Sequence, residues 1–282
     1  MSVKIIVDST ADVSAKIKDE LTVVPLTLRF GDEEYIDGVT ITKTEFYEKL
    51  IESDVMPSTS QANIDSFDEV FSKIAENGDT AVVLTVSSKL SGTYNSARIA
   101  AEDHPDKIFV IDTQSVSIGI GVLAETALEL ALDGCTAEYI AEYIEEEKKR
   151  VRIIAMFDTL EYLQKGGRIS KTAAIAGGLL SIKPVITLKD GEITILGKAR
   201  GSKQANNFLA SEITNAGGID FNKPLLLGYT GLSDLTLKKY VEDSAHLYRD
   251  HLESLEYTTI GSVVGTHAGP GAIGVAFWQN NI

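Results

Sequence analysis

Three short polar segments hold the side chains of this sequence that could do chemistry. They are Pro57-Ser58-Thr59-Ser60-Gln61, the run from Ser87 to Tyr94, and Gly265-Thr266-His267-Ala268-Gly269-Pro270-Gly271. Ser91-Gly92-Thr93 is predicted to open a helix, where hydroxyls and free backbone N–H groups can hold an anion. Simple N-capping by Ser91 would explain that serine as well. The residues alone therefore predict either an anion site or ordinary cap chemistry.

His267 is the side chain that could add acid–base chemistry to these segments. It lies among glycines at 265, 269 and 271, and such a density of glycine suggests that the backbone closely approaches another group. A lone histidine is more often structural than functional, so the glycines give only a slight preference for function. The histidine spacings match no zinc site, and we expect no metal and no cofactor.

An enzyme is one alternative interpretation of the same residues. Ser91 as nucleophile and His267 as base, with Asp8 or Asp112 as the acid, would make an esterase or thioesterase acting on acyl substrates. The sequence lacks the G-x-S-x-G elbow that usually presents such a serine. A phosphate- or nucleotide-binding module at Ser91-Gly92-Thr93 is a further alternative. The glycine-rich run 269–274 fits a dinucleotide-binding pattern but precedes a predicted strand rather than a helix.

The composition limits the classes of partner. The chain has 282 residues, a formal net charge of −15, 44% hydrophobic residues and one cysteine, Cys135. An acidic excess of this size argues against a general affinity for nucleic acid or for an anionic membrane. A single cysteine cannot form an internal disulfide and favours a reducing compartment. Because no run of apolar residues is long enough to span a bilayer, we expect a cytoplasmic protein without an integral membrane segment.

The first half of the chain alternates apolar strands with amphipathic helices. This βαβ pattern predicts an α/β domain over residues 1–150 with a mainly parallel sheet and flanking helices. Ligands of such sheets bind beyond the carboxyl ends of the strands, where the run from Ser87 is predicted to lie. The expected strands are 3–7, 23–30, 80–86 and 107–111, with a small hairpin reaching 35–36, and the expected helices are 44–53, 64–75, 91–102, 118–132 and 136–149.

The second half mixes hairpins with crossovers, which predicts an α+β domain with a mixed sheet over residues 151–282. Asp190-Gly191 is a strong hairpin signal. We expect the ligand between the two domains, and the last strand and the His267 loop could pack back on the first domain. The expected strands are 151–157, 184–187, 192–196, 224–229, 257–264 and 273–278, and the expected helices are 159–164, 171–180, 203–215 and 234–252.

Positive charge is concentrated in one part of this acidic chain. Residues 158–205 hold eight Lys or Arg against four Asp or Glu, so this stretch carries +4 while the remainder carries −19. Solvated lysines are the ordinary explanation. A docking surface for an anionic ligand or an acidic partner is the functional one.

Seven segments, in order and over essentially the whole chain, resemble the DegV family. Each motif is weak alone, but the ordered set is specific. The segments are Asp8-Ser9-Thr10-Ala11-Asp12, Pro57 to Gln61, Leu90 to Ala97, Leu160 to Ile169 (with Lys165-Gly166-Gly167-Arg168), Lys183-Pro184-Val185, Lys198-Ala199-Arg200-Gly201 and His267 to Gly271. One departure is Ala62, which follows Gln61 where the family frequently has proline.

The resemblance implies a two-domain α/β protein that binds one long-chain fatty acid in a buried tunnel. It would be the binding subunit of a bacterial fatty acid kinase, without turnover of its own. The separate ATP-dependent catalytic subunit phosphorylates the carboxylate, giving an acyl-phosphate for phospholipid synthesis. Carried over by position, Thr59, Ser60, Ser91, Gly92 and His267 would form the carboxylate site. Arg168 and Arg200 would engage the kinase.

Elementary energetics agree with this implication. A chain of about 16 carbons gains ~0.8 kcal/mol for each CH₂ that is buried, before the costs of ordering it. Tail burial would therefore supply most of the affinity, and neutral hydroxyls could orient the carboxylate without trapping it as a pair of arginines would. The apolar run 173–180 suits a tunnel wall or lid, and ordinary interdomain packing equally well.

Overall fold

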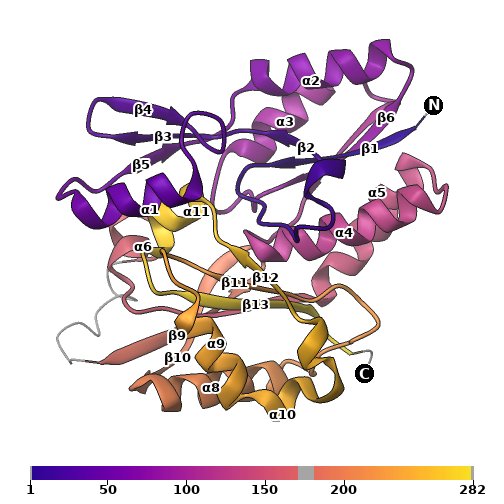
Figure 1. Cartoon of the computed structure of the whole chain (residues 1–282). Helices are drawn as coiled ribbons and strands as arrows, with labels where there is room; N and C mark the ends of the chain where they lie inside the picture. Colours follow the sequence, from indigo (N-terminus) through magenta and orange to yellow (C-terminus); the bar gives the residue numbers. More distant parts are fainter. Residues whose placement is uncertain (1, 171–180, 281–282) are drawn as a thin grey trace.

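A four-stranded parallel sheet forms the centre of the first half of the molecule (Figure 1). The computed structural model describes residues 2–170 and 181–280. The strand order is β2-β1-β6-β7, and the bounds are Val3–Asp8 (β1), Thr22–Val24 (β2), Thr80–Thr85 (β6) and Ile108–Asp112 (β7). All six residues of β6 are buried, which is why its apolar run lacks the polar alternation of a half-exposed strand.

Helices cover both faces of this sheet, because alternate strand residues are apolar on both sides. Ile6 and Val83 face α2 and α3, whereas Val7 and Leu84 face α4 and α5. Side chains of Asn63 and Thr136 cap the first turns of α2 and α5. The bounds are Ile64–Glu76 (α2), Thr93–Ala101 (α3), Ile118–Leu132 (α4) and Ala137–Glu147 (α5), followed by a 3-10 turn at Lys148–Arg150.

The second half is built on a six-stranded mixed sheet. Its order is β10-β9-β8-β13-β11-β12. Helices α8 (Ser202–Asn215) and α9 (Leu235–Asp243) pack on its outer face, followed by α10 (Ala245–Tyr248) and a 3-10 segment at Arg249–Ser254. The strands are Val151–Met156 (β8), Ile182–Lys189 (β9), Glu192–Arg200 (β10), Leu226–Tyr229 (β11), Glu256–Thr259 (β12) and Ile273–Trp278 (β13).

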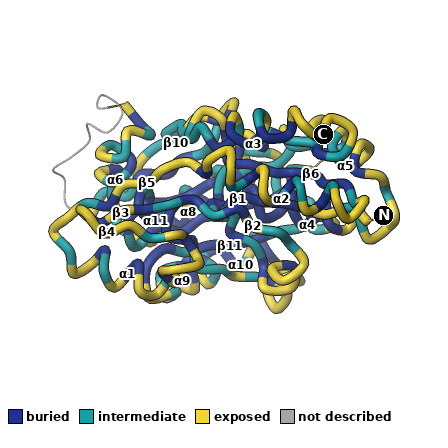
Figure 2. The backbone as a smooth tube through the Cα atoms, turned by 90° about the horizontal axis from the view of Figure 1, so that it is seen from above, coloured by how far each residue is buried: buried dark blue, intermediate teal, exposed yellow. Residues whose placement is uncertain are grey.

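Helix α4 lies between the two sheets (Figure 1). It contacts β1 and β6 of the parallel sheet and β8, β11 and β13 of the mixed sheet. Residues 118–128 are all buried, as expected for a helix that is apolar on every side. The one buried carboxylate in this stretch, Glu125, pairs with Lys16. In Figure 2, buried backbone lies along the middle of the molecule and most exposed segments lie at its periphery.

A small antiparallel sheet, β4-β3-β5, projects from the first half beside α1 and α11 (Figure 1). Leu28 and Phe30 of this sheet pack on Phe46 and Tyr47 of α1. A complete capping box at Thr42 and Glu45 fixes the start of α1. The bounds are Thr27–Phe30 (β3), Glu33–Ile36 (β4), Ser58–Ser60 (β5), Lys43–Glu52 (α1) and Ser262–Ala268 (α11), with a 3-10 turn earlier at Lys18–Glu20.

The predicted architecture is confirmed: a parallel sheet with helices on both faces, and a separate mixed sheet. The hairpin at Asp190-Gly191 is present, with φ of 51° and 81° at its two central residues, the backbone of a type I′ turn. The mixed sheet begins at Val151, while α11 packs on α1 and β3 of the first half. The division into domains of 1–150 and 151–282 stays a prediction.

Two predicted strands are wrong in detail. The expected strand 23–30 is two strands in different sheets, because Pro25 lacks the N–H that a continuous ladder would need. The expected strand 257–264 ends at Thr259, and residues 262–268 are helical, so His267 is not in a loop. The β-branched pattern there is overridden by the tertiary context: this helix packs on α1, so closely that a Cβ on Gly265 would lie 2.6 Å from the Tyr47 hydroxyl.

Two predicted helices differ from those in the structure, and a third cannot be compared. The helix expected at 234–252 is broken into α9, α10 and the 3-10 segment, and Arg249 takes a φ of +42° at the last junction. The helix expected at 91–102 starts at Thr93, so Gly92 rather than Ser91 is its N-cap residue. The helix expected at 171–180 lies outside the described residues.

Candidate functional site

A cavity lies where the carboxyl edge of the parallel sheet meets the inner face of the mixed sheet. It encloses about 980 Å³ of empty space, counting the part that opens to solvent. Its lining comes from both halves of the molecule, and is Thr10, Leu26, Thr59, Ser60, Gln61, Val86, Leu90, Ser91, Val116, Ser117, Ile118, Ile153, Ala155, Phe157, Leu163, Arg168, Ile186, Leu188, Ile193, Thr230, Ile260, Val263, Val264, His267, Ala268, Ala272, Ile273 and Gly274.

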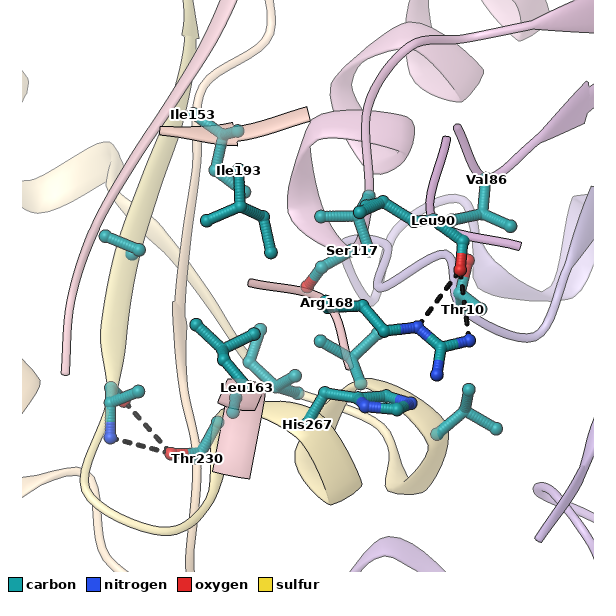
Figure 3. Close-up of a pocket in the computed structure, with 18 of the residues that line it drawn as sticks. Thr10, Val86, Leu90, Ser117, Ile153, Leu163, Arg168, Ile193, Thr230 and His267 are labelled. Carbon is teal, nitrogen blue, oxygen red and sulfur yellow. Dashed lines mark hydrogen bonds between the residues drawn. The ribbon is translucent and has the colours of Figure 1, made fainter. Parts of the chain in front are cut away.

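Most of the cavity wall is apolar. Part of it follows from the alternation of side chains along a strand, which places every second residue on the same face of the sheet. In β8 and the residue after it, Ile153, Ala155 and Phe157 face the cavity, whereas Ile154 and Met156 face α8 and α9. Ile193 on β10 and Leu163 on α6 (Glu161–Lys165) lie among the lining groups in Figure 3. The cavity can therefore hold a long apolar group away from water.

One region of the wall gathers polar groups from elements far apart in the sequence. Thr59 of β5 and His267 of α11 are joined by a hydrogen bond of 2.9 Å between Oγ1 and Nε2. The other imidazole nitrogen, Nδ1, is buried and has no hydrogen-bond partner within the described structure. A Cβ on Gly166 would lie 2.2 Å from that nitrogen, so the glycine at 166 leaves room for the ring.

His267 is neutral at physiological pH. Burial, and then the positive charge of Arg168, lower its pKa from 6.5 to about 4. We assign the proton of the neutral ring to Nε2, because that tautomer leaves no buried N–H without an acceptor. Nε2–H then donates to Thr59 Oγ1, and the Thr59 hydroxyl hydrogen is free to donate into the cavity.

A second hydroxyl, that of Ser91, is held by the start of α3. The Thr93 N–H donates to Ser91 Oγ at 3.3 Å, and the two hydroxyl oxygens lie 2.9 Å apart. Thr93 Oγ1 also accepts the Ala62 N–H at 3.3 Å, so its own hydrogen can point to Ser91. With both acceptor positions of Ser91 Oγ used in this way, its O–H is available to a ligand.

The other two residues expected at this site are placed differently. Ser60 lines the cavity and is largely exposed. Gly92 is not among the lining residues; a Cβ there would lie 2.0 Å from Oε1 of Gln61, whose Nε2 donates to Ser96 at 2.9 Å. Gly92 therefore admits the Gln61 side chain, and a direct contact between Gly92 and a ligand stays a prediction.

The two arginines expected to engage a partner lie in different settings. Arg168 lines the cavity and is half-buried; Figure 3 shows its side chain between Leu90 and His267. Its Nε and Nη2 each donate to the Leu90 carbonyl at 3.1 Å, and Nη1 donates to the Gly166 carbonyl at 2.7 Å. Arg200 is exposed at the end of β10 and does not line the cavity.

Asp12 fixes the helix that carries His267. Its buried carboxylate accepts the N–H of Gly261, which precedes α11, at 2.7 Å and the Ser117 hydroxyl at 2.7 Å. Lys43 of α1 pairs with the same carboxylate at 2.8 Å. The first loop of the chain thus holds the starts of α4 and α11 together.

The carboxylate of Asp8 holds together two loops at the carboxyl edge of the parallel sheet. Its Oδ1 accepts the Thr10 hydroxyl at 2.6 Å and its Oδ2 accepts the Val86 N–H at 2.7 Å. Burial raises the pKa of this carboxyl, and the hydrogen bonds oppose that rise. Thr10 and Val86 line the cavity, and the rule that ligands lie at the carboxyl edge of a parallel sheet could have found Thr10.

The described residues do not place a carboxylate against His267, as a Ser-His-acid triad would require. His267 uses Nε2 for Thr59, and Nδ1 reaches no carboxylate among the described residues. Asp8 is committed to Thr10 and Val86, and Asp112 accepts the N–H groups of Ser88 and Gln114. A serine hydrolase needs its base oriented by a third group, so the required chain of contacts is missing here.

Two other features are absent from residues 2–170 and 181–280. There is no group of three His, Cys, Asp or Glu side chains that could hold a metal ion. There is also no helix long and apolar enough to cross a membrane.

Comparison with known proteins places this chain among relatives of similar length. Residues 2–280 match the family model described as "Uncharacterised protein, DegV family". A DegV domain-containing protein of Caldanaerobacter subterraneus is 37% identical over 98% of both chains. A DegV family protein of Thermus thermophilus, solved for its fatty acid binding, superimposes with a TM-score of 0.87 at 30% identity, covering 99% of this chain and 100% of that one.

A Thermotoga maritima structure, described as revealing a fatty acid binding function, has a TM-score of 0.82 at 29% identity and covers 99% of this chain and 100% of its own. Sequence, length and fold agree throughout these matches. The chain therefore belongs to the DegV family.

Proposed function

We propose that this protein binds one long-chain fatty acid in its cavity and presents the carboxylate to a separate ATP-dependent kinase. The observation that carries the proposal is an apolar cavity whose polar groups gather at Thr59, Ser91 and His267. Similar structures described as fatty-acid-binding proteins support it. The reducing cytoplasm suits a chain with a single cysteine.

The site favours orientation of the carboxylate over tight capture. The hydroxyls of Thr59 and Ser91 can each donate one hydrogen bond to a carboxylate oxygen, and the neutral His267 adds no charge that would hold it. Arg168 lies nearby but is already bonded to two carbonyls. A carboxylate bound by neutral donors stays nucleophilic toward a phosphoryl group, which a bidentate arginine pair would hinder.

Partner docking by Arg168 and Arg200 follows from the family resemblance and from the charge pattern. Arg200 is exposed in the positively charged stretch 158–205 of a chain with net charge −15. Arg168 lies at the polar region of the cavity, so its guanidinium is close to where an acyl-phosphate would form. A kinase that brings ATP would meet positive charge at both arginines.

Native mass spectrometry of protein purified from a bacterial host tests binding most directly. We expect a co-purified species with the mass of a long-chain fatty acid. Protein that is consistently empty and that also fails to take up added palmitate would rule the proposal out. Ester hydrolysis by the purified protein that disappears in Ser91→Ala, while palmitate binding survives, would instead favour the esterase interpretation.

A further inference from the structure

A second hollow lies between the two halves, separate from the polar region described above. It is a cleft with about 1280 Å³ of empty space, counting its open side. Ile153 and Leu188 line both this cleft and the apolar cavity. The lining is Thr113, Gln114, Ser115, Lys148, Lys149, Val151, Arg152, Ile153, Ile154, Thr187, Leu188, Lys189, Asp190, Gly191, Leu196, Glu212, Asn215 and Ala216.

Three cations of this cleft lack a carboxylate partner. Across residues 2–170 and 181–280, no Asp or Glu lies within ion-pair distance of Lys149, Arg152 or Lys189, and the remaining stretches contain no Asp or Glu in the sequence. Lys148 differs, because it pairs with Glu145 at 2.6 Å. The cleft therefore gathers three cations without an ion pair to any described carboxylate, although Asp190 and Glu212 also line it.

Arg152 differs from the other two cations, because both lysines are exposed. The residue is half-buried, and its Nη1 donates only to the backbone carbonyls of Lys149 and Val151. Burial lowers its pKa. Desolvating a cation without an anion costs free energy, and an anion bound in the cleft would offset part of that cost at Arg152.

The loop after β7 adds a second observation. Gln114 lines the cleft with a φ of +52°, a conformation that a non-glycine residue adopts at a cost and that clusters at functional sites. Asp190 also has a positive φ, but its hairpin turn explains that. The Gln114 loop follows the carboxyl end of a parallel strand, the edge where ligands of such sheets bind.

We propose that this cleft binds a small anion of the phosphate class, with Arg152 as its main ligand. Lys149 and Lys189, both exposed at the rim, would contact the outer oxygens, and the Gln114 amide would add a donor. A guanidinium offers paired donors that match phosphate oxygens. Val151, Leu188 and Leu196 provide an apolar wall, so the phosphate can be free or part of an alkyl phosphate.

Calorimetric titration at constant ionic strength tests the proposal, with protein preloaded with palmitate so that the apolar cavity is filled. Pyrophosphate and octyl phosphate serve as the two probes. We expect one saturable site, weakened at least about 10-fold in Arg152→Gln, since a charge-assisted contact is lost. Lys149→Gln/Lys189→Gln, which changes exposed positions, tests the same site if Arg152→Gln fails to fold.

The matched control is Lys4→Gln/Lys18→Gln, which removes two exposed cations outside the cleft and should leave binding unchanged. Equal loss in control and cleft variants, or no saturable binding of either probe, overturns the proposal. Tighter binding of octyl phosphate than of pyrophosphate identifies a lipid phosphate, and the reverse order identifies a free phosphate. Failure to load palmitate counts against the proposed function alone, because pyrophosphate can still be titrated.

Discussion

The polar and the apolar parts of the main cavity are built by different means. The polar part brings together Thr59, Ser91 and His267 from three elements, each fixed by a hydrogen bond or by the start of a helix. The apolar part combines the inner face of the mixed sheet, where the strand period places Ile153 and Ile193, with apolar side chains of other elements such as α4 and α11. Affinity for the tail should therefore depend on these apolar groups, and orientation of the head group on the three polar side chains.

This division teaches that the two parts can be altered independently. Apolar burial is non-directional and roughly proportional to area, so small changes in the sheet should be tolerated and a charge should not. Hydrogen bonds to a carboxylate are directional, so loss of one hydroxyl should matter only for ligands that have the carboxylate.

The largest effect is expected from a charge in the apolar part. Ile193→Asp should weaken palmitate binding about 100-fold or more, because a carboxylate must be desolvated beside the acyl chain. Displacement of a fluorescent fatty acid measures this. Ile193→Val keeps the apolar surface and should change the affinity by less than about 5-fold. Unchanged affinity in Ile193→Asp would mean that the tail does not lie along β10.

Removing a hydroxyl from the polar part should have a smaller and ligand-dependent effect. Thr59→Val and Ser91→Ala should each weaken palmitate binding by at least about 10-fold, because a hydrogen bond to a charged group is worth roughly 1.5–3 kcal/mol. The methyl ester of palmitate serves as the control ligand and should lose little affinity. If acid and ester weaken equally in both variants, these hydroxyls shape the cavity rather than bind the carboxylate.

Arg168 and Arg200 should separate presentation from binding. Arg200→Ala should lower kcat/KM for acyl-phosphate formation by the kinase subunit about 10-fold, through weaker association with the partner, and leave palmitate affinity unchanged. Arg168→Ala should also impair turnover while binding persists. Lys18→Ala, another exposed cation, is the control. Normal turnover in both arginine variants would remove the docking role.

The last prediction concerns the pH dependence of stability in the protein without a ligand. The pKa of His267 is about 4 in the folded state against 6.5 for a free imidazole, so the unfolded chain binds the proton first as the pH falls. The stabilisation that the neutral His267 imidazole contributes is therefore fully present above about pH 6.5. It is lost progressively as the pH falls toward 4. Urea unfolding should show a flatter pH dependence over this window in His267→Asn than in the wild type.

The wild type and His267→Asn both contain the buried carboxyls of Asp8 and Asp37, whose pKa values burial raises. These groups therefore cancel in the difference between the two pH profiles. Exposed His246 provides the control substitution, His246→Asn. An identical pH dependence in the wild type and in His267→Asn would show that the imidazole is not shielded from protonation.

Local patterns were sufficient for most of the fold. The fully apolar run of β6, the stripes of α2 and α5 and the Asp190-Gly191 turn each carry their own signal. The pattern failed at residues 257–264, where the β-branched run Val263-Val264 predicted strand but residues 262–268 form a helix that packs closely on α1, with Gly265 beside Tyr47. No local signal could report that contact, because the two residues are far apart in the chain.

In the candidate site too, local patterns do not report contacts between residues far apart in the chain. The sequence by itself determined which residue types were available: hydroxyls at 59 and 91, an imidazole among glycines at 267, and strands apolar enough to line a cavity. Only the tertiary structure decided that Thr59 bonds His267, that Asp12 fixes α11, and that Arg168 lies beside the imidazole and lowers its pKa. Those facts depend on distances between elements that are separated by up to 249 residues, and sequence patterns report only neighbours along the chain.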